Sequence, residues 1–573
     1  MTGGLGLDDA YGAAVERIKA QDDEKSRLGI TALMWICHSE RPLGAEELCH
    51  ALAVEIGATG CNTPNVSSIR TVLGCCQGLV VIDDDGSTVR LIHYTLHEYL
   101  ASHSNLFQSP HSAIAETCLE YLNSEPIMAL SGSRLPKPQH PPFLEYSSLY
   151  WGAHIRKQLT DRGKALSLKL FGCYQYHISI SILLEHTLGR DPLRSIFDFY
   201  KFTGLHYASI FGLVEVASAL IEMDGVDINC IDDTSATPLI WAARNGHEEV
   251  VKLLLGCENI NPDKPDRDNR TPISQAAVNG HEAAVRLLLG RKDVNPDRPD
   301  DGKRTPLSWA AGNGHEPVVK LLLGRKDVNP DKRDGDHRTP ISWAAGKGHE
   351  SVVKLLLGRK DVNPDRPDDE DRTSISWAAG NGHEAVVKLL LGRKDVDPDR
   401  PDDEDRTPIF WAAENGHEAV VKLLLGREDV SPDRPDRYNR TPISWAAGNG
   451  CEAVVKVLLG CKDVNPDRLD DNDRTPISWA AEGGHEEVVK LLLGRKDVNP
   501  DRPDRWGRAP ISLAAEFGCV AVVKLLLGWE HVKPHRPDIW GRTPISLAAR
   551  CGHDAVVKLL HEWSDVNSDK PAK

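Results

Sequence analysis

Apolar and polar positions follow a helical period through the C-terminal two-thirds of the chain, and the pattern returns every 34 residues. In the unit that opens at Thr407, a first apolar run from Pro408 ends at Gly416, and a second spans residues 418–425. This spacing predicts two short helices joined by a glycine turn and followed by an extended finger. A helix pair of this size cannot bury its apolar face alone, so the units must stack on one another.

The residue that opens each unit fixes the register. It falls at Thr203, Thr237, Thr271, Thr305, Thr339, Thr373, Thr407, Thr441, Thr475, Ala509 and Thr543. A threonine hydroxyl here can cap the first helix. The proline that follows lacks an N–H, which would have no partner within the helix at the first helical position. Eleven units without an insertion predict an open-ended stack rather than a globule built around one pocket.

Spaced motifs within each unit identify the kind of repeat. In the Thr407 unit they are Thr407-Pro408-Ile409, Ala412-Ala413, Gly416-His417, Val420-Val421 and Leu423-Leu424-Leu425. The period of 34 residues also belongs to tetratricopeptide repeats, but these motifs resemble the ankyrin repeat over residues 201–573. The resemblance implies a mostly α fold, an ankyrin-repeat solenoid of about eleven repeats.

The units depart from the ankyrin pattern at two places. Serine replaces the usual histidine of the first helix, so that a small hydroxyl must make the local hydrogen bond, at Ser308, Ser342, Ser376, Ser444 and Ser478. Asn or Asp often replaces the glycine before x-T-P, at Asn269, Asp371, Asp405, Asn439 and Asp473. Asn and Asp tolerate a left-handed backbone, so we expect the turn to survive.

The first 200 residues carry no repeat. Three predicted helices (28–37, 45–54 and 66–76) precede two predicted strands (79–82 and 89–92) joined by a turn at 83–86. Three helices followed by a hairpin outline a winged helix. We therefore expect four parts: a helical lead-in at 1–27, a winged-helix-like domain at 28–104, a helical linker region at 105–200 and the ankyrin array at 201–573.

Short strings in this region carry a second resemblance. They are His93, Thr95, Glu98, Tyr99 and Leu100, then Phe143 to Tyr146, then Tyr150-Trp151. Over residues 8–160 they resemble the segments between the NTPase module and the ankyrin array in fungal STAND proteins of the NACHT–ankyrin type. That module itself is missing, because the chain has no G-x-x-x-x-G-K-[ST] to cradle a triphosphate. Residues 79–83 resemble the apolar strand and aspartate of a Walker B motif. Because the phosphate-binding loop is missing, a strand of the wing is the better interpretation.

Composition limits the partners. Acidic residues outnumber basic ones by 84 to 68, and the third predicted helix offers only Arg70, which disfavours binding to nucleic acid or an anionic membrane. The 13 cysteines are scattered, and no signal peptide and no run of 18 apolar residues is present. We expect a cytoplasmic protein, with a nuclear location as the alternative. No nucleophile, base and acid stand together, so we expect no enzyme, no cofactor and no small-molecule substrate.

Three recurring residue types allow a functional or a structural interpretation. The tryptophans are an aromatic ligand platform or a packing ladder, and their phase with the scaffold favours the ladder: Trp241, Trp309, Trp343, Trp377, Trp411, Trp445 and Trp479. The Gly-His histidines occur once per unit without a second ligand, which favours a hydrogen bond between helices over a metal site. The Asp-rich fingers miss calcium-loop spacing and favour a solvated, salt-bridged edge.

Specificity should come from positions that differ between units. In ankyrin proteins that bind partners, the finger tips and the ends of the first helices make the contacts on the concave face. On this sequence those positions are Asp336, His337, Lys347, Glu370, Glu404, Glu414, Arg437, Tyr438, Arg505, Trp506, Phe517, Trp540 and Arg550. Because the tips turn aromatic toward the C-terminus, we expect the main contact within residues 437–551, unless the last units have merely diverged.

Three function classes follow from these observations. The first is a non-enzymatic scaffold that binds a protein partner on the ankyrin array. The second is the sensor or regulatory half of a STAND-type receptor whose NTPase part is absent or separately encoded. The third is nucleic-acid binding by the winged helix, which the charge balance opposes.

Overall fold

The computed structural model describes residues 7–55, 66–83, 87–130, 140–172, 177–188 and 201–567. The chain divides into two compact units, which we name unit 1 (residues 1–276 and 283–295) and unit 2 (residues 277–282 and 296–573). The tip of the predicted wing turn, 84–86, and the end of the predicted linker, 189–200, lie outside the described residues.

Unit 1 begins with the predicted three helices and hairpin. The elements are α1 (Leu7–Lys19), α2 (Asp23–His38), β1 (Leu43–Gly44), α3 (Ala45–Leu52), α4 (Ile69–Cys75), β2 (Val80–Ile82) and β3 (Thr88–Leu91). The antiparallel sheet has the order β1-β3-β2, and Val81 pairs with Arg90. The sequence did not predict β1, because two residues carry no alternation. Trp35, Leu48 and Val72 form the core between the helices and the sheet and are at most 1% exposed.

A helical region follows in unit 1. It comprises α5 (Tyr94–Ser102), the 3-10 helix η2 (Ser104–Leu106), α6 (Pro110–Leu122), α7 (Glu125–Met128), α8 (Leu144–Lys157), α9 (Asp161–Phe171) and α10 (Ile178–Leu188). The ring of Trp151 on α8 stacks on Tyr207 of the first repeat, with centroids 4.7 Å apart. A Cβ added to Gly152 would lie 2.8 Å from Phe211, so the glycine permits this close packing. The helical region and the first repeat therefore share one core.

Eleven helix pairs form the repeats. Their bounds are α11 (Gly204–Phe211), α12 (Val214–Ile221), α13 (Pro238–Arg244), α14 (Glu248–Leu255), α15 (Pro272–Val278), α16 (Glu282–Leu289), α17 (Pro306–Gly312), α18 (Glu316–Leu323), α19 (Pro340–Gly346), α20 (Glu350–Leu357), α21 (Ser374–Gly380), α22 (Glu384–Leu391), α23 (Pro408–Glu414), α24 (Glu418–Leu425), α25 (Pro442–Gly448), α26 (Glu452–Leu459), α27 (Pro476–Glu482), α28 (Glu486–Leu493), α29 (Pro510–Glu516), α30 (Val520–Leu527), α31 (Pro544–Arg550) and α32 (Asp554–Asn567). The predicted mostly helical array is confirmed. No helix among the described residues has the length and apolar character needed to cross a membrane.

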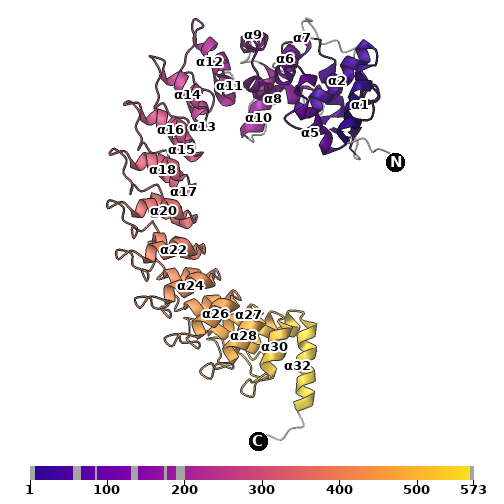
Figure 1. Ribbon diagram of the computed structural model, residues 1–573. Helices are drawn as coiled ribbons and strands as arrows, with labels where there is room; N and C mark the ends of the chain where they lie inside the picture. Colours follow the sequence, from indigo (N-terminus) through magenta and orange to yellow (C-terminus); the bar gives the residue numbers. More distant parts are fainter. Residues whose placement is uncertain are drawn as a thin grey trace. The chain divides into compact units, whose positions relative to one another are not determined.

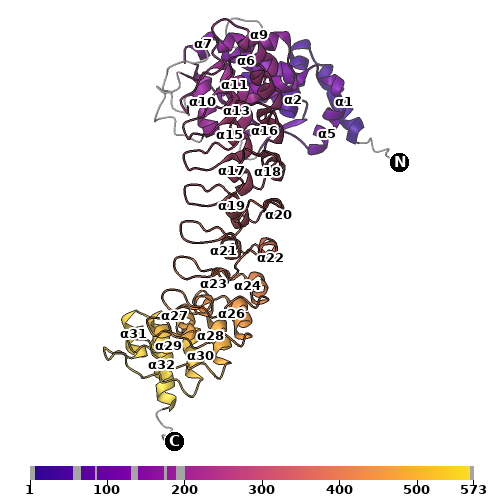
Figure 2. The same cartoon turned by 90° about the vertical axis from the view of Figure 1, so that its left-hand side faces the viewer.

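Within unit 2 the pairs stack in order (Figure 1). First helices pack on first helices and second helices on second helices, which form two rows beside the finger loops in Figure 2. Leu307, Ala311, Val319 and Leu322 have no exposed surface, and their equivalents in the next repeats share this burial. Burial of these side chains between neighbouring pairs supplies the main stabilisation of the stack.

Most Gly-His histidines fasten one repeat to the one before it by a hydrogen bond. His349 Nε2 donates to the carbonyl of Gly312 at 3.0 Å, and His383 donates to Gly346 at 3.2 Å. The imidazole ring lies against Gly314, whose φ is +75° and whose added Cβ would meet His349 Nδ1 at 2.6 Å. The predicted hydrogen bond between helices is confirmed, and the glycine is required both for its backbone angle and for the approach of the ring.

The predicted helix cap is present in most repeats but not in the one that opens at Thr407. Thr305 Oγ1 accepts the N–H of Ser308 at 3.1 Å and pairs with its hydroxyl at 3.0 Å. In the Thr407 repeat, Phe410 replaces the serine, and Thr407 Oγ1 is buried without a hydrogen-bond partner among the described residues. The prediction that Thr407 caps its helix is therefore wrong, because the residue that completes the hydroxyl pair has changed.

Candidate partner-binding site

A recurring set of three residues, which we call a rung, lines the first helices of unit 2. It consists of an Asp at the finger turn, an Arg four residues later and the Trp of the first helix. In one rung, Asp334 Oδ1 accepts the backbone N–H groups of Asp336 at 3.1 Å and Arg338 at 2.8 Å. Asp334 Oδ2 accepts the indole Nε1–H of Trp343 at 2.7 Å. One buried carboxylate thus shapes the finger turn and orients the tryptophan.

The turn aspartates correct one sequence expectation. We expected the Asp-rich fingers to form a solvated edge, but these carboxylates are at most 7% exposed at Asp300, Asp334, Asp368, Asp402, Asp436, Asp470, Asp504 and Asp538. Backbone N–H donors and the indole replace water around them. The salt-bridged part of the expectation holds for other positions, such as Arg359 with Asp361 at 2.7 Å and Arg366 with Asp331 at 2.9 Å.

The rung tryptophans of unit 2 are half-buried, and arginines stack on them. The Arg338 guanidinium lies 3.7 Å from the ring centroid of Trp343 and 3.9 Å from that of Trp377 in the next repeat. Burial between the two rings lowers the pKa of Arg338 to about 10, which leaves the group charged at neutral pH. The tryptophans are a ladder, as predicted, and at two places in it an arginine lies between the indoles of successive repeats. We call the space between the indoles of two successive repeats a slot.

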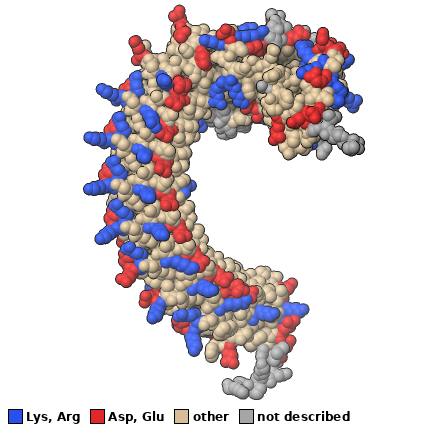
Figure 3. Space-filling view, in the orientation of Figure 1, with Lys and Arg blue, Asp and Glu red and all other residues tan. Residues whose placement is uncertain are grey.

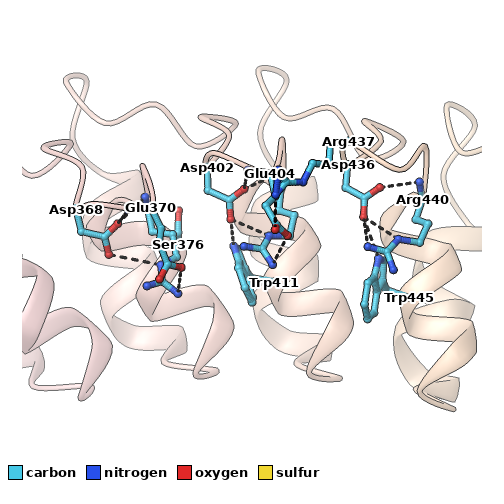
Figure 4. A network of polar contacts seen from close by, with 12 residues as sticks. Asp368, Glu370, Ser376, Asp402, Glu404, Trp411, Asp436, Arg437, Arg440 and Trp445 are labelled. Atoms are coloured by element: carbon cyan, nitrogen blue, oxygen red, sulfur yellow. Dashed lines mark hydrogen bonds and ion pairs between the residues drawn. The ribbon is translucent and has the colours of Figure 1, made fainter. Parts of the chain in front are cut away.

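The residue two positions before the rung arginine, which we call the tip residue, differs from repeat to repeat, and so do the contacts of that arginine. The tip residues are Gly302, Asp336, Glu370, Glu404, Tyr438, Asn472, Trp506 and Trp540. Where the tip is Glu404, its carboxylate holds Arg406 at 3.0 Å, and Arg406 also pairs with Asp402 at 2.9 Å. Where the tip is Tyr438, its ring lies 4.8 Å from the Arg440 guanidinium. Figure 4 shows Arg440 turned toward its own aspartate, Asp436.

An open pocket lies in the slot between Trp445 and Trp479. Its volume is about 220 Å³, and its lining comprises Arg440, Ser444, Trp445, Gly448, Asn449, Trp479, Glu482 and Gly483. Arg440 Nε donates to Asp436 at 2.9 Å and so does not bridge to Trp479. Gly448 and Gly483 contribute no side chain. The pocket is open because its own arginine is turned back and its two ends carry glycine.

The finger tips of unit 2 are linked in a row. Asp403 N donates to Glu370 O at 3.1 Å and Arg437 N to Glu404 O at 3.0 Å, and the Arg437 side chain adds an ion pair to Glu404 at 2.6 Å. On the face drawn in Figure 3, basic and acidic side chains are intermixed along unit 2. The tips therefore present a continuous edge of mixed charge rather than separate loops.

Comparison with known families agrees with this architecture. A family model described as "Ankyrin repeats (3 copies)" matches residues 171–266, 205–300, 239–334, 307–402, 375–470 and 461–535, which together span more than half of the chain. The chain belongs to the ankyrin-repeat family. A model of a single ankyrin repeat matches residues 540–570. Residues 17–112 match the model described as "GPI inositol-deacylase, winged helix domain", in agreement with the predicted winged helix.

One curated relative is similar to part of this ankyrin protein. It is the "Azaphilone pigments biosynthesis cluster protein L" of Monascus ruber, 26% identical over 257 residues, which cover 40% of this chain and 53% of the relative. This chain therefore spans about half the length of the relative that it matches.

The structure places every sequence-predicted contact residue of the ankyrin array on the surface or half-buried. Exposed are Asp336, His337, Lys347, Glu370, Arg437, Tyr438, Arg505, Phe517, Trp540 and Arg550, and half-buried are Glu404, Glu414 and Trp506. At Trp506 the Arg508 guanidinium lies over the ring, 4.9 Å from its centroid. Burial raises the pKa of the Glu414 carboxyl, and nearby Arg406 and Arg440 oppose this effect.

Sequence reasoning missed the residues that make the pocket. Arg440, Trp445 and Trp479 were assigned to the scaffold or not considered, although the spacing D-x-x-x-R-T-P-x-x-W repeats through the ankyrin units. That fixed spacing is the signal that could have placed the arginine against the tryptophan. It does not reveal which slot is open, because this depends on the tip residue.

Three potential metal ligands lie together in unit 1, at Glu40, His111 and His154. Each already has a partner. The Nδ1 atoms of the two histidines are 2.9 Å apart, His154 Nε2 is 2.9 Å from the Tyr146 hydroxyl, and Lys157 pairs with Glu40 at 2.6 Å. The hydrogen bonds and the ion pair account for the cluster, and the expectation of no metal site stays a prediction.

Proposed function

We propose that this ankyrin protein is a non-enzymatic scaffold that captures a protein partner on the first-helix and finger side of unit 2. The observation that carries the proposal is the open pocket between Trp445 and Trp479. At about 220 Å³ it is smaller than the roughly 300–1,000 Å³ of small-molecule sites, so it suits one side chain of a larger partner. Two indoles and an arginine at its walls are the residue types that dominate protein interfaces.

Exposed apolar side chains support the same region. Among the described residues, ten large hydrophobic side chains are exposed, and six of them lie between residues 438 and 540: Tyr438, Phe517, Val520, Trp529, Ile539 and Trp540. Single exposed apolar residues are ordinary on protein surfaces, but a concentration in one part of a repeat array marks an interaction surface. The proposed contact therefore covers residues 437–551, as the sequence predicts.

Capture of the partner by the full chain tests the proposal. Gly448→Leu fills the pocket, and its new Cβ meets Trp479 Cβ at an ordinary 3.6 Å. Gly380→Leu is the matched control, because its Cβ meets Trp411 at 3.5 Å in a repeat outside the proposed contact. We expect the first variant to lose a partner that wild type and the control both recover from an extract of the source cells.

A second pair of changes tests the aromatic tips. Trp506→Ala combined with Trp540→Ala removes two large side chains, of which Trp540 is 58% exposed. We expect reduced recovery of the same partner. Unchanged recovery with both this double variant and Gly448→Leu would exclude the proposed contact surface.

A regulatory half of a STAND-type receptor is the alternative function. The observation in its favour is that the winged-helix region, the helical region and the first repeats lie in one compact unit. A partner that binds the first repeats would therefore act on the same unit that contains the winged helix. Sequencing the transcript upstream of Met1 tests it. A P-loop NTPase in frame would support this alternative, and a stop codon close to Met1 would oppose it.

A cytoplasmic or nuclear location and the absence of a cofactor belong to the proposal as well. The cysteines among the described residues are free thiols, several of them buried, which supports a reducing compartment. Fluorescence microscopy of the tagged full chain would test the location. A secreted or vesicular signal would contradict it.

A further inference from the structure

The array itself shows what a slot between two indoles can hold. The Arg304 guanidinium lies 4.7 Å from the ring centroid of Trp309 and 3.9 Å from that of Trp343 in the next repeat. Arg338 occupies the following slot in the same way, at 3.7 Å from Trp343 and 3.9 Å from Trp377. In two successive slots, therefore, a planar cation is stacked between two aromatic faces, where the ring quadrupoles attract it.

A buried carboxylate completes the slot that Arg304 fills. Arg304 Nε lies 3.5 Å from Asp334 Oδ2, which belongs to the turn of the next repeat and is 1% exposed as a side chain. The arginine of one repeat thus faces the turn aspartate of the next. The chemistry of a filled slot is two indole rings and one carboxylate around a guanidinium.

The slot between Trp445 and Trp479 has the same walls, but its own arginine, Arg440, contacts only the first indole and leaves the face of Trp479 open. Tyr438 and Asp436 hold Arg440 against its own indole, at 4.2 Å from the centroid of Trp445. The equivalent of Asp334 here is Asp470, 6% exposed. It accepts N–H groups from Asn472 at 2.8 Å, Arg474 at 2.9 Å and Trp479 at 3.1 Å.

Charge around this slot favours a cation. Asp470 has no ion-pair partner within the part of the chain that the structure describes, although its equivalents Asp334 and Asp436 each face an arginine side chain. Glu482, at the edge of the pocket, adds a second carboxylate, which is 25% exposed and is shared with Arg474. Arg474 balances the charge of Glu482, and Asp436 balances that of Arg440, so the charge left unbalanced at the slot is that of Asp470. A negative side chain of a partner would be repelled by it.

We propose that the slot between Trp445 and Trp479 binds the guanidinium of an arginine side chain from the protein partner, stacked between the two indoles and facing Asp470. This inference rests on the proposed function and adds the chemistry of the partner. Arginine fits better than lysine, because its planar group stacks on both rings while its edge still donates to a carboxylate. The partner residue takes the place that Arg304 and Arg338 take in their own slots.

Peptide binding to the full chain tests the inference. The probes are fluorescent Gly/Ser peptides that differ only in one central residue: arginine, lysine, citrulline or leucine. Citrulline keeps the size and shape of arginine but lacks the charge. We expect the arginine peptide to bind at least about tenfold more tightly than the citrulline peptide, which corresponds to about 1.4 kcal/mol. The lysine peptide should fall between them.

Gly448→Arg supplies the specificity control. The array already carries arginine at this position of the first helix in Arg244, whose guanidinium lies 5.2 Å from the ring centroid of Trp241. The variant should therefore fold and fill the slot with its own guanidinium, which abolishes the preference for the arginine peptide. Gly380→Arg, at the same position two repeats earlier, should leave that preference unchanged.

The possible outcomes separate the inference from the proposed function. Equal binding of the arginine and citrulline peptides, absence of binding by any peptide, or a preference that persists in Gly448→Arg would overturn the inference. Partner capture that is still lost in Gly448→Leu would at the same time sustain the proposed function. Loss of the arginine preference only in Gly448→Arg would sustain the inference.

Discussion

The indole Nε1–H of Trp343 donates to Oδ2 of Asp334 at 2.7 Å, and the other oxygen of that carboxylate accepts two backbone N–H groups of the finger turn. The contact joins a first helix to the finger that precedes it. The sequence suggests that Asp334 is solvated, but its carboxylate is buried and accepts three N–H groups of its own repeat.

Asp334→Ala should destabilise its repeat strongly. The change leaves two backbone N–H groups and the indole N–H without their acceptor, and a lost hydrogen bond to a charged group costs about 1.5–3 kcal/mol. Asp336→Ala, two residues away and exposed, should change stability by less than about 0.5 kcal/mol. Hydrogen exchange of the peptides from this finger and α19 measures both, and equal effects would contradict the assigned role of Asp334.

Two threonines at the same position of the repeat should respond differently to valine. Thr305→Val removes a helix cap and should cost about 1 kcal/mol. Thr407→Val replaces a buried hydroxyl that has no hydrogen-bond partner among the described residues, and should be neutral or slightly stabilising. Urea unfolding of the two full-length variants gives the comparison. A similar loss in both would show that Thr407 makes a hydrogen bond in solution.

Glycines that end the first helices should differ in their tolerance of alanine. Gly314 and Gly552 have nearly the same φ, +75° and +77°, so both substitutions strain the backbone by about 1–2 kcal/mol. Only at Gly314 would the new Cβ also meet the histidine of the next repeat, His349, at 2.6 Å. Thermal unfolding should therefore show a clearly larger loss for Gly314→Ala. Equal losses would mean that the ring moves aside freely.

His206 should make unit 1 sensitive to acid. Burial lowers the pKa of His206 from 6.5 to about 4, and nearby Asp232 offsets this only in part. His206 Nδ1 accepts the N–H of Thr203 at 3.1 Å and Nε2 donates to Ala236 O at 3.1 Å, which requires the neutral ring. Since the folded pKa is the lower one, the contribution is complete above about pH 6.5 and is lost as pH falls toward about 4.

The size of this loss can be bounded and tested. A difference of about 2.5 pKa units corresponds to at most about 3 kcal/mol. Urea midpoints of the full chain at about pH 7.5 and about pH 5 should differ more for wild type than for His206→Gln, which cannot titrate. Parallel pH dependence of the two proteins would remove His206 from the explanation.

Tyr438 should control whether the pocket is open. In Tyr438→Gly the tip matches Gly302, where Arg304 reaches across to the next indole, so we expect Arg440 to turn between Trp445 and Trp479 and close the slot. Tyr438→Phe keeps the ring and should keep the pocket. Crystal structures of the two variants decide the matter. An unmoved Arg440 in Tyr438→Gly would show that Asp436 alone holds it.

The sequence predicted most of the fold, because the information is local and repeated. Motifs such as Thr407-Pro408 and Gly416-His417 set helix starts, turns and the contact between neighbouring repeats, and the winged helix follows from three helices before a hairpin. The left-handed tip turns were also predicted from Asn and Asp, although Lys303 and His337 adopt the same φ of +57° and +55°. At those two positions the buried turn aspartate, rather than local preference, imposes the angle.

The candidate site was predicted less well, because its arrangement depends on competition between contacts. Arg304 and Arg440 occupy equivalent positions, yet one stacks on the next repeat while the other pairs with its own aspartate. Local pattern does not distinguish them. The difference comes from the tip residue, Gly302 or Tyr438, and from the balance between an ion pair and a second aromatic face.

The tip position affects how partner binding by this protein can evolve. The turn aspartate, the histidine contact and the buried core recur in most repeats, so a repeat can be copied or lost in register with little damage to its neighbours. A few codons per repeat, those of the tip and of the slot's glycines, then decide whether the adjacent slot is closed by the chain's own side chains or left for another molecule. Partner binding by this array can thus change one repeat at a time, through mutations that do not alter the hydrophobic core.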